Sequence, residues 1–154
     1  MNTKIWLALI VVILVGLGGL LYLSQQPVVD IKDVNLGSST ITENYSSTLS
    51  FRVESGWNLP NGIYNVELRI EAPEILSFYV AGVGQLRRIG SIWYLPLGNL
   101  MKPFNMPVAL MVRAGSLPAM TSSITSTMDI QIYLGNELKN SKTINITVSR
   151  ATTS

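Results

Sequence analysis

Residues Met128–Val148 read MDIQIYLGNELKNSKTINITV and carry the clearest structural pattern of the chain. In both halves of this stretch, apolar residues occupy every second position and mostly polar residues fill the positions between them. Such alternation puts one set of side chains on each face of a β-strand. We therefore predict a β-hairpin, with strands 128–134 and 142–148 joined around Gly135–Ser141. The side chains predicted to face water are those of Asp129, Gln131, Asn145 and Thr147.

The same period of two recurs on the N-terminal side of this hairpin. It is clear at 49–53, 64–70 and 108–112, and weaker at 28–36, 75–83 and 89–95. Turn-forming glycine, proline and asparagine residues separate these runs. Seven or eight short strands over residues 28–150 predict an all-β fold, specifically an immunoglobulin-like or fibronectin-like β-sandwich.

The N-terminal part of the chain follows a different pattern. Ile5–Leu23 is a run of 19 residues without a charge. As a helix it would be about 28 Å long, close to the roughly 30 Å of a bilayer's hydrocarbon core. We predict a transmembrane signal-anchor helix here, in contact with membrane lipid. A cleaved signal peptide is the alternative, but the apolar run is longer than usual and no small-residue cleavage site follows it.

The predicted organisation follows from these two regions. A cytoplasmic tip (1–4) precedes the helix (5–23), a spacer (24–27), an extracytoplasmic sandwich (28–150) and a tail (151–154). Lys4 is the only charged side chain before the helix, which favours an N-terminus inside the cell. The expected localisation is therefore the cell membrane, with a single pass and the C-terminal domain outside.

The residue types missing from the chain limit its chemistry. It contains no cysteine and no histidine, which excludes disulfides, the common zinc, haem and iron–sulfur sites, and Ser-His-Asp or Cys-His catalysis. The carboxylates of Glu54, Glu67 and Glu71 alternate with apolar residues, as on a solvated strand face. We predict that the protein is not an enzyme and uses no cofactor or metal. The net charge of +2 predicts no nucleic-acid partner.

The most unusual segment of the predicted domain is Arg87–Pro107, RRIGSIWYLPLGNLMKPFNMP. Aromatic residues, methionine and arginine are enriched at the centres of protein interfaces. One interpretation is a core strand at 89–95 followed by a loop over the sandwich edge; the other is a surface that binds a partner. The candidate partner-binding residues are Arg87, Arg88, Trp93, Tyr94, Met101, Phe104 and Met106.

Alternation within this segment places Ile89, Trp93 and Leu95 on one strand face and Tyr94 on the other. Since both faces are apolar, another chain could cover one of them. A Phe104→Ser variant distinguishes the two interpretations, because it disrupts assembly if Phe104 binds a partner and unfolds the domain if Phe104 belongs to the core.

Two Asn-x-Ser/Thr sequences, at Asn44 and Asn145, are candidate glycosylation sites. The predicted topology puts both on the exported side, where an acceptor must lie on the surface. Chance matches are frequent in a chain this rich in serine and threonine.

A short tip, one apolar helix (Ile5–Leu23) and a cysteine-free, Ser/Thr-rich strand region (Val28–Val148) form a layout that resembles archaeal cell-envelope proteins. It is most similar to accessory or stator proteins of the archaellum, the archaeal flagellum. Archaeal pilins look similar, but Met1–Ile5 departs from their processing sequence. The resemblance implies a non-enzymatic role in anchoring, in bridging to a surface layer and in association.

We therefore predict a membrane-anchored extracytoplasmic structural or binding protein of the cell envelope, acting by protein–protein association as a scaffold or stator. Its expected partners are other envelope or membrane proteins, including further copies of itself. The alternative is a small accessory subunit of a membrane-bound respiratory or transport complex. Co-purification with a cofactor-bearing subunit would favour the alternative, and co-purification with filament or surface-layer material would favour the first prediction.

Overall fold

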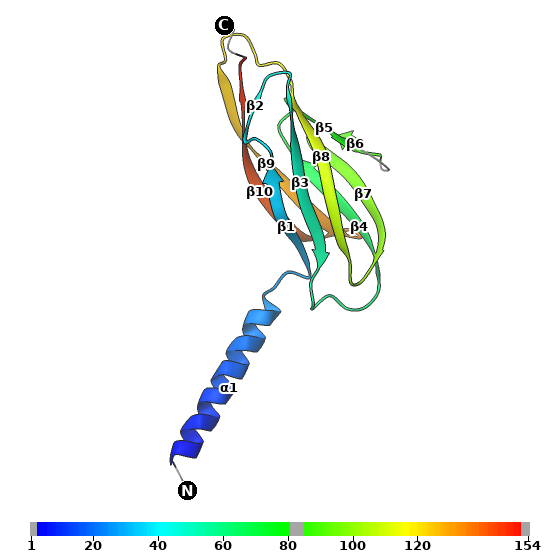
Figure 1. The fold of residues 1–154 in the computed structure, drawn as a ribbon. Coiled ribbons are helices and arrows are strands. Elements are labelled where there is room, and N and C mark those ends of the chain that lie inside the picture. Colours follow the sequence, from blue (N-terminus) through cyan, green and yellow to red (C-terminus); the bar gives the residue numbers. More distant parts are fainter. Residues whose placement is uncertain (1–2, 81–84, 152–154) are drawn as a thin grey trace.

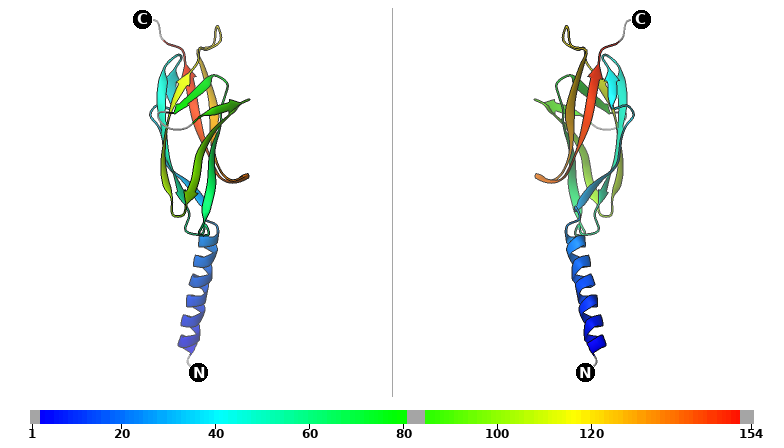
Figure 2. Two further views of the ribbon diagram at one scale, coloured as in Figure 1. Left: turned by 90° about the vertical axis from the view of Figure 1, so that its right-hand side faces the viewer. Right: turned by 90° about the vertical axis from the view of Figure 1, so that its left-hand side faces the viewer.

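The structure is a computed structural model that describes residues 3–80 and 85–151, with the helix side chains described from Ala8 onward. Helix α1 (Thr3–Ser24) projects from one end of a domain built from two β-sheets (Figures 1 and 2). We call this end of the domain the base and the opposite end the distal tip. The four-stranded sheet has the order β1 (Val29–Leu36), β3 (Ser46–Ser55), β8 (Asn105–Ala114) and β5 (Leu76–Val80). The six-stranded sheet has the order β2 (Thr40–Thr42), β10 (Glu137–Ser149), β9 (Ser123–Leu134), β4 (Ile63–Glu71), β7 (Ile92–Met101) and β6 (Arg87–Ile89).

The predicted all-β fold is confirmed, but the number of strands differs. The described residues form ten strands rather than seven or eight. The additional strands, β2 and β6, have three residues each, which is too short to produce a recognisable alternation. The predicted strand at 75–83 corresponds to β5, which ends at Val80, and residues 81–84 lie outside the described part of the chain.

The predicted C-terminal hairpin is confirmed. Strands β9 and β10 pair antiparallel, with Met128 opposite Ile144. Met128, Ile130 and Ile132 are completely buried, and each such side chain stabilises the fold by about 1.5–3 kcal/mol. The four side chains predicted to face water are all at least partly exposed.

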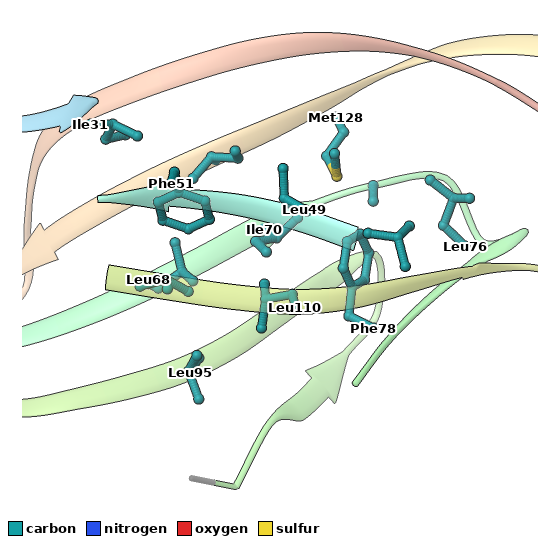
Figure 3. Close-up of a cluster of buried hydrophobic side chains, with 14 of the residues drawn as sticks. Ile31, Leu49, Phe51, Leu68, Ile70, Leu76, Phe78, Leu95, Leu110 and Met128 are labelled. Atoms are coloured by element: carbon teal, nitrogen blue, oxygen red, sulfur yellow. The ribbon is translucent and has the colours of Figure 1, made fainter. Parts of the chain in front are cut away.

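The hydrophobic core lies between the facing sides of the two sheets (Figure 3). Leu49 and Phe51 of β3 and Leu110 of β8 contribute from the four-stranded sheet, and Leu68 and Ile70 of β4 contribute from the six-stranded sheet. No polar or charged residue is buried among the residues whose side chains the structure describes, 8–80 and 85–151. The sandwich therefore holds together by apolar packing, as a domain without disulfides must.

The structure corrects the prediction of a single-pass membrane protein. In the part of the chain that the structure describes, no helix is both long and apolar enough to cross a membrane. The expected localisation, with the N-terminus inside and the domain outside the cell membrane, is therefore wrong on this finding.

The segment that joins α1 to the sandwich is fixed to the base. The N–H of Gly56 donates to the carbonyl oxygen of Val28 (2.7 Å), and Nδ2 of Asn58 donates to that of Gln26 (2.9 Å). A Cβ atom at Gly56 would lie only 2.5 Å from the carbonyl oxygen of Pro27. The loop between β3 and β4 therefore sets the direction in which α1 leaves the domain.

Candidate partner-binding surfaces

The structure separates the candidate residues of Arg87–Pro107 into several locations. This segment forms β6, β7 and the start of β8, so the expected loop over the sandwich edge is largely strand. Strands β7 and β8 follow each other in the chain but belong to different sheets, and their connection turns at the base (Figure 1). The seven candidate residues therefore do not form one continuous surface.

Trp93 lies on the inner side of the six-stranded sheet. Its ring meets that of buried Phe78 edge-on, with 5.6 Å between the ring centroids. Arg88 is paired with Trp93 in the β6–β7 register, and its guanidinium lies 5.6 Å from the centre of the indole ring. Trp93 thus packs against the core beside Phe78 of β5, and the exposed Arg88 side chain lies near its indole ring.

Tyr94 lies on the outer side of the same sheet, paired with Arg87 on β6 and with Arg69 on β4. The Arg69 guanidinium carbon lies 5.2 Å from the centre of the Tyr94 ring and 3.7 Å from that of Tyr133. Arg69 also forms an ion pair with Glu67 (2.7 Å), and this hydrogen bond raises the pKa of the arginine. The groups around Tyr94 already satisfy one another, which is typical of a packed sheet surface.

Met101 lies at the base, where it joins an exposed apolar surface. It is directly opposite Ile63 in the β4–β7 register, and both side chains are about two-thirds exposed. Nζ of Lys102 donates to the carbonyl oxygens of Trp57 (2.8 Å) and Leu59, which brings exposed Trp57 to the same end of the sandwich. We call Trp57, Ile63 and Met101 the basal rim.

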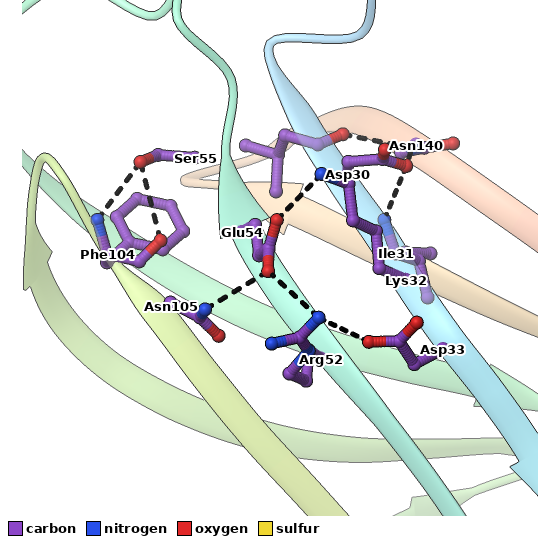
Figure 4. Close-up of polar contacts among 11 residues, drawn as sticks. Asp30, Ile31, Lys32, Asp33, Arg52, Glu54, Ser55, Phe104, Asn105 and Asn140 are labelled. Carbon is purple, nitrogen blue, oxygen red and sulfur yellow. Dashed lines mark hydrogen bonds and ion pairs between the residues drawn. The ribbon is translucent and has the colours of Figure 1, made fainter.

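Phe104 is half-buried and packs against the core. Its backbone is held to Ser55 by three hydrogen bonds. The N–H of Ser55 donates to the carbonyl oxygen of Phe104 (3.0 Å). Oγ of Ser55 accepts from the N–H of Phe104 (3.0 Å) and donates to its carbonyl oxygen (3.4 Å) (Figure 4). This environment agrees with the core interpretation of the segment at this position.

Met106 borders an opening at the side of the sandwich. Strand β5 pairs with β8 only from Leu110 onward, and β6 pairs only with the first residues of β7. The lower edges, meaning the end of β7 after Tyr94 and the start of β8 before Leu110, have no strand neighbour on this side among the described residues. A cavity of about 210 Å³ lies between them, lined by Val80, Leu95, Pro96, Leu97, Met106, Pro107, Val108 and Ala109.

Each of these open edges carries a proline, Pro96 on β7 and Pro107 on β8. Proline has no N–H to donate to an added strand, and it occurs in edge strands where its nitrogen faces solvent. Edge prolines are one of the devices that prevent uncontrolled pairing between chains. The side opening is therefore a poor site for continuous strand addition.

A cluster of charges covers the outer face of β1 and β3 (Figure 4). The Glu54 carboxylate forms ion pairs with Nζ of Lys32 (2.8 Å) and with a guanidinium nitrogen of Arg52 (3.6 Å). Arg52 also forms an ion pair with Asp33. The hydrogen bond with Glu54 raises the pKa of Lys32. Lys32, Arg52 and Asp33 are exposed, whereas Glu54 at the centre of the cluster is partly buried. The described residues contain no group of three or more acidic side chains that could hold a metal ion.

Both candidate glycosylation sites are exposed. Asn44 lies in the turn before β3 with a positive φ of 67°, and its Oδ1 accepts a hydrogen bond from Oγ of Ser116 (3.1 Å). Asn145 lies on the outer face of β10, opposite Thr127. Their modification stays a prediction.

Sequence patterns did not single out Trp57, Ile63 or Met120 as candidate binding residues. Trp57 and Ile63 flank the Pro60–Gly62 turn, which indicates a loop but not which side chains it exposes. Met120 lies between β8 and β9 in a Ser/Thr-rich stretch, and its side chain is completely exposed. The only signal that could have found it is the position of an isolated large apolar residue within a polar loop.

Comparisons with known proteins add a fold but no family. Neither a protein-family model nor a curated protein matches the sequence. Among solved structures, a cohesin module from a family 33 glycoside hydrolase of Clostridium perfringens is similar to it, with a TM-score of 0.53 and 9% identity over 82% of this chain and 100% of the module. Domains 4 and 5 of the S-layer protein SbsC reach a TM-score of only 0.36, with 12% identity over 82% of this chain and 54% of theirs. The first similarity shows a shared fold alone, and the second is too weak to carry an argument.

Proposed function

We propose that the protein is a structural or binding protein that acts by protein–protein association, with α1 as the element that a partner covers. Val12, Leu14 and Val15 point in different directions around the helix axis, and each is at least 63% exposed. The apolar surface therefore surrounds the helix instead of forming a stripe directed at the sandwich. This single observation carries the proposal.

A helix that is apolar on every side is buried in its working state, because water disfavours so much exposed apolar area. The sandwich does not supply the cover, since α1 projects away from it (Figures 1 and 2). Burying these apolar side chains against another polypeptide would stabilise the complex by about 25 cal/mol for each Å² of apolar surface removed from water.

The base of the sandwich supports the same proposal. The side chains of the basal rim, Trp57, Ile63 and Met101, are exposed. Trp57 lies between Gly56 and Asn58, which bind the segment that leads to α1. Because the Gly56 and Asn58 hydrogen bonds fix the connection to α1, a partner on the helix would meet the rim at a defined position.

The finer form of the proposal is a scaffold or stator protein of the cell envelope, as in the archaellum accessory proteins that the layout resembles. What supports it is a cysteine-free sandwich behind one apolar helix. An immunoglobulin-like or fibronectin-like sandwich belongs to the same proposal. The order β1-β3-β8-β5 parallels the A-B-E-D sheet of that fold, and β10-β9-β4 parallels its G-F-C sheet.

The test compares native complexes in cells of the source organism. Three tagged versions of the full-length chain are cross-linked, and the size of the complex that each forms is measured: the wild type, Leu14→Asp and Gln25→Asp. The aspartate at position 14 lies within the apolar helix, whereas position 25 is exposed just beyond its end, which makes Gln25→Asp the matched charge control. Wild type and Gln25→Asp should run above the 16.9 kDa of one chain, and Leu14→Asp should run as a single chain. Equal complexes for all three would contradict the proposal.

A further inference from the structure

The turn between β3 and β4 contains the one place in the chain where glycine follows asparagine, Asn61-Gly62. Both residues are exposed, and they lie just before β4 begins at Ile63. The backbone nitrogen after an asparagine can close a five-membered ring onto the side-chain amide carbon, and glycine has no Cβ atom to hinder that approach. The turn therefore brings a reactive pair of groups to the surface of the base (Figure 1).

The structure holds the backbone on both sides of this pair and leaves the pair itself open to water. The hydroxyl of Tyr64 donates to the carbonyl oxygen of Pro60 (2.7 Å), and the N–H of Lys102 donates to that of Gly62 (3.1 Å). Within residues 3–80 and 85–151, the N–H of Gly62 donates to no backbone carbonyl. Water can therefore reach the nitrogen that would close the ring.

Asn140 offers a comparison within the same chain, since the small residue Ser141 follows it. Nδ2 of Asn140 donates to the carbonyl oxygen of Val29 (2.9 Å), and its Oδ1 accepts from the N–H of Ser141 (2.8 Å). Both residues belong to β10 and pair with β9, which keeps their backbone extended. The atoms that would have to move for ring closure are thus fixed at Asn140, whereas Asn61 lies in an exposed turn.

We infer that Asn61 is a site of non-enzymatic deamidation in the folded protein. Water removes the proton from the N–H of Gly62, and the electron pair of that nitrogen attacks Cγ of Asn61. The N–Cγ bond forms, the Cγ–Nδ2 bond breaks, and Nδ2 takes up a proton and leaves as ammonia.

Water then opens the cyclic imide at either of its two carbonyl carbons. Breaking the new N–Cγ bond gives aspartate at position 61, and breaking the original peptide bond gives isoaspartate. Overall, one water molecule is consumed and one ammonia is released, and no atom is oxidised or reduced. Because the reaction needs only water and this turn, it is independent of any partner.

The conversion changes both the charge and the backbone of the base. A carboxylate replaces a neutral amide, so the formal net charge of +2 falls by one, and the isoaspartate form adds one carbon to the main chain of the turn. Pro60 and Ile63 help to line an apolar pocket of about 370 Å³. The charged residues at its border, Glu137 and Lys139, form an ion pair in which the hydrogen bond from Lys139 lowers the pKa of Glu137. The new negative charge would therefore lie near an apolar surface whose bordering cation is already paired.

Incubation of the folded, full-length chain in heavy-oxygen water tests this site. After digestion at acidic pH, we expect the peptide that contains position 61 to show a mass gain of about one dalton from the exchange of NH₂ for OH, together with one heavy oxygen. It should separate into aspartate and isoaspartate isomers. Conversion should be faster at pH 8.5 than at pH 5.5, because the reacting nitrogen must lose its proton. The peptide that contains Asn140 should stay unchanged.

The matched control is Gly62→Ala, since the nearest atoms to an added Cβ belong to the Tyr64 ring, at 3.6 Å. This variant should lose most of the conversion, because the Cβ hinders ring closure. No conversion at position 61 of the folded wild type, or equal conversion in Gly62→Ala, overturns the inference.

The same incubation in guanidinium chloride tests the part played by the fold. Conversion at position 140 should rise several-fold on unfolding, while that at position 61 should change little. A larger rise at position 61 than at position 140 would show that the folded turn protects Asn61, and this result also overturns the inference.

Discussion

At Gly56 the segment that follows α1 lies close against the backbone of the sandwich. A Cβ atom there would be 2.5 Å from the carbonyl oxygen of Pro27, and the backbone on both sides of the contact is hydrogen-bonded. We expect Gly56→Ala to lower the free energy of unfolding by about 1–3 kcal/mol, because the connection must move. Urea unfolding followed by tryptophan fluorescence measures this change.

The matched control for that prediction is Gly62→Ala. The nearest atoms to a Cβ atom at Gly62 belong to the Tyr64 ring, at 3.6 Å, which is ordinary contact. We expect a change within about 0.5 kcal/mol, as for an unremarkable surface substitution. Equal effects of the two variants would show that the tight contact at Gly56 is not what costs stability.

Phe104 provides the second prediction. We expect Phe104→Ser to destabilise the fold by about 2–3 kcal/mol, less than the roughly 3–5 kcal/mol of a fully buried phenylalanine, because the side chain is half-buried. Met101→Ser should stay within about 0.5 kcal/mol, since that side chain is exposed. Denaturant unfolding measures both, and an unchanged midpoint for Phe104→Ser would return this residue to the candidates for partner binding.

Alternation predicted the faces of individual residues only where the strand continues. Trp93 and Leu95 share the inner face and Tyr94 the outer face, as expected. Ile89 instead lies opposite Ile92, because a turn at Gly90, with φ of 63°, reverses the chain between them. The exposure of Met120 depends on its backbone conformation and on distant Glu43 and Arg150, which no local pattern contains.

Among the elements, the lower edges of β7 and β8 are the ones most open to pairing with another chain, and Pro96 and Pro107 protect them. We expect the double variant Pro96→Val and Pro107→Val to aggregate faster, because it restores an N–H on each open edge. Light scattering and thioflavin fluorescence under mild destabilisation measure the rate. Pro118→Val, in the loop between β8 and β9, is the control. If the double variant aggregates only as fast as Pro118→Val, the edge prolines do not have this role.

The long hairpin β9–β10 could be predicted because its pairing is local and its alternation is long. Pairing between distant segments could not. Strand β2 runs parallel to the end of β10, with Thr40 beside Thr147, and three residues leave no periodic signal. The sequence could not predict where the candidate residues of Arg87–Pro107 lie relative to one another, because that depends on β7 and β8 joining different sheets.

For the whole molecule, the ionisable groups predict a wide range of constant stability. The lowered pKa of Glu137 adds stability above its ordinary value of 4.5, and this is lost as the pH falls through the folded-state pKa. The raised pKa of Lys32 adds stability below its ordinary value of 10.5, and this is lost as the pH rises through the folded-state pKa. The chain has no histidine to titrate in between. Urea midpoints should therefore agree between pH 5.5 and 8.5, and a fall from pH 7.5 to 5.5 would contradict this reasoning.

At the same scale, composition and periodicity predicted an all-β fold, and the described residues form ten strands after one helix. The step from a long apolar run to a membrane-spanning helix is the one that the structure does not support. What remains is an apolar helix that the sandwich leaves uncovered. The account therefore depends on what lies against α1 in the working protein.

A photocross-linker on α1 tests that directly. Leu14→Cys carries the only thiol of the full-length chain, so a thiol-reactive benzophenone attached there reports what lies against the helix in the native complex. Thr48→Cys, on the exposed outer face of β3, is the matched control. We expect illumination to join position 14, and not position 48, to a second polypeptide. A chain that stays at 16.9 kDa after illumination at position 14 would contradict it.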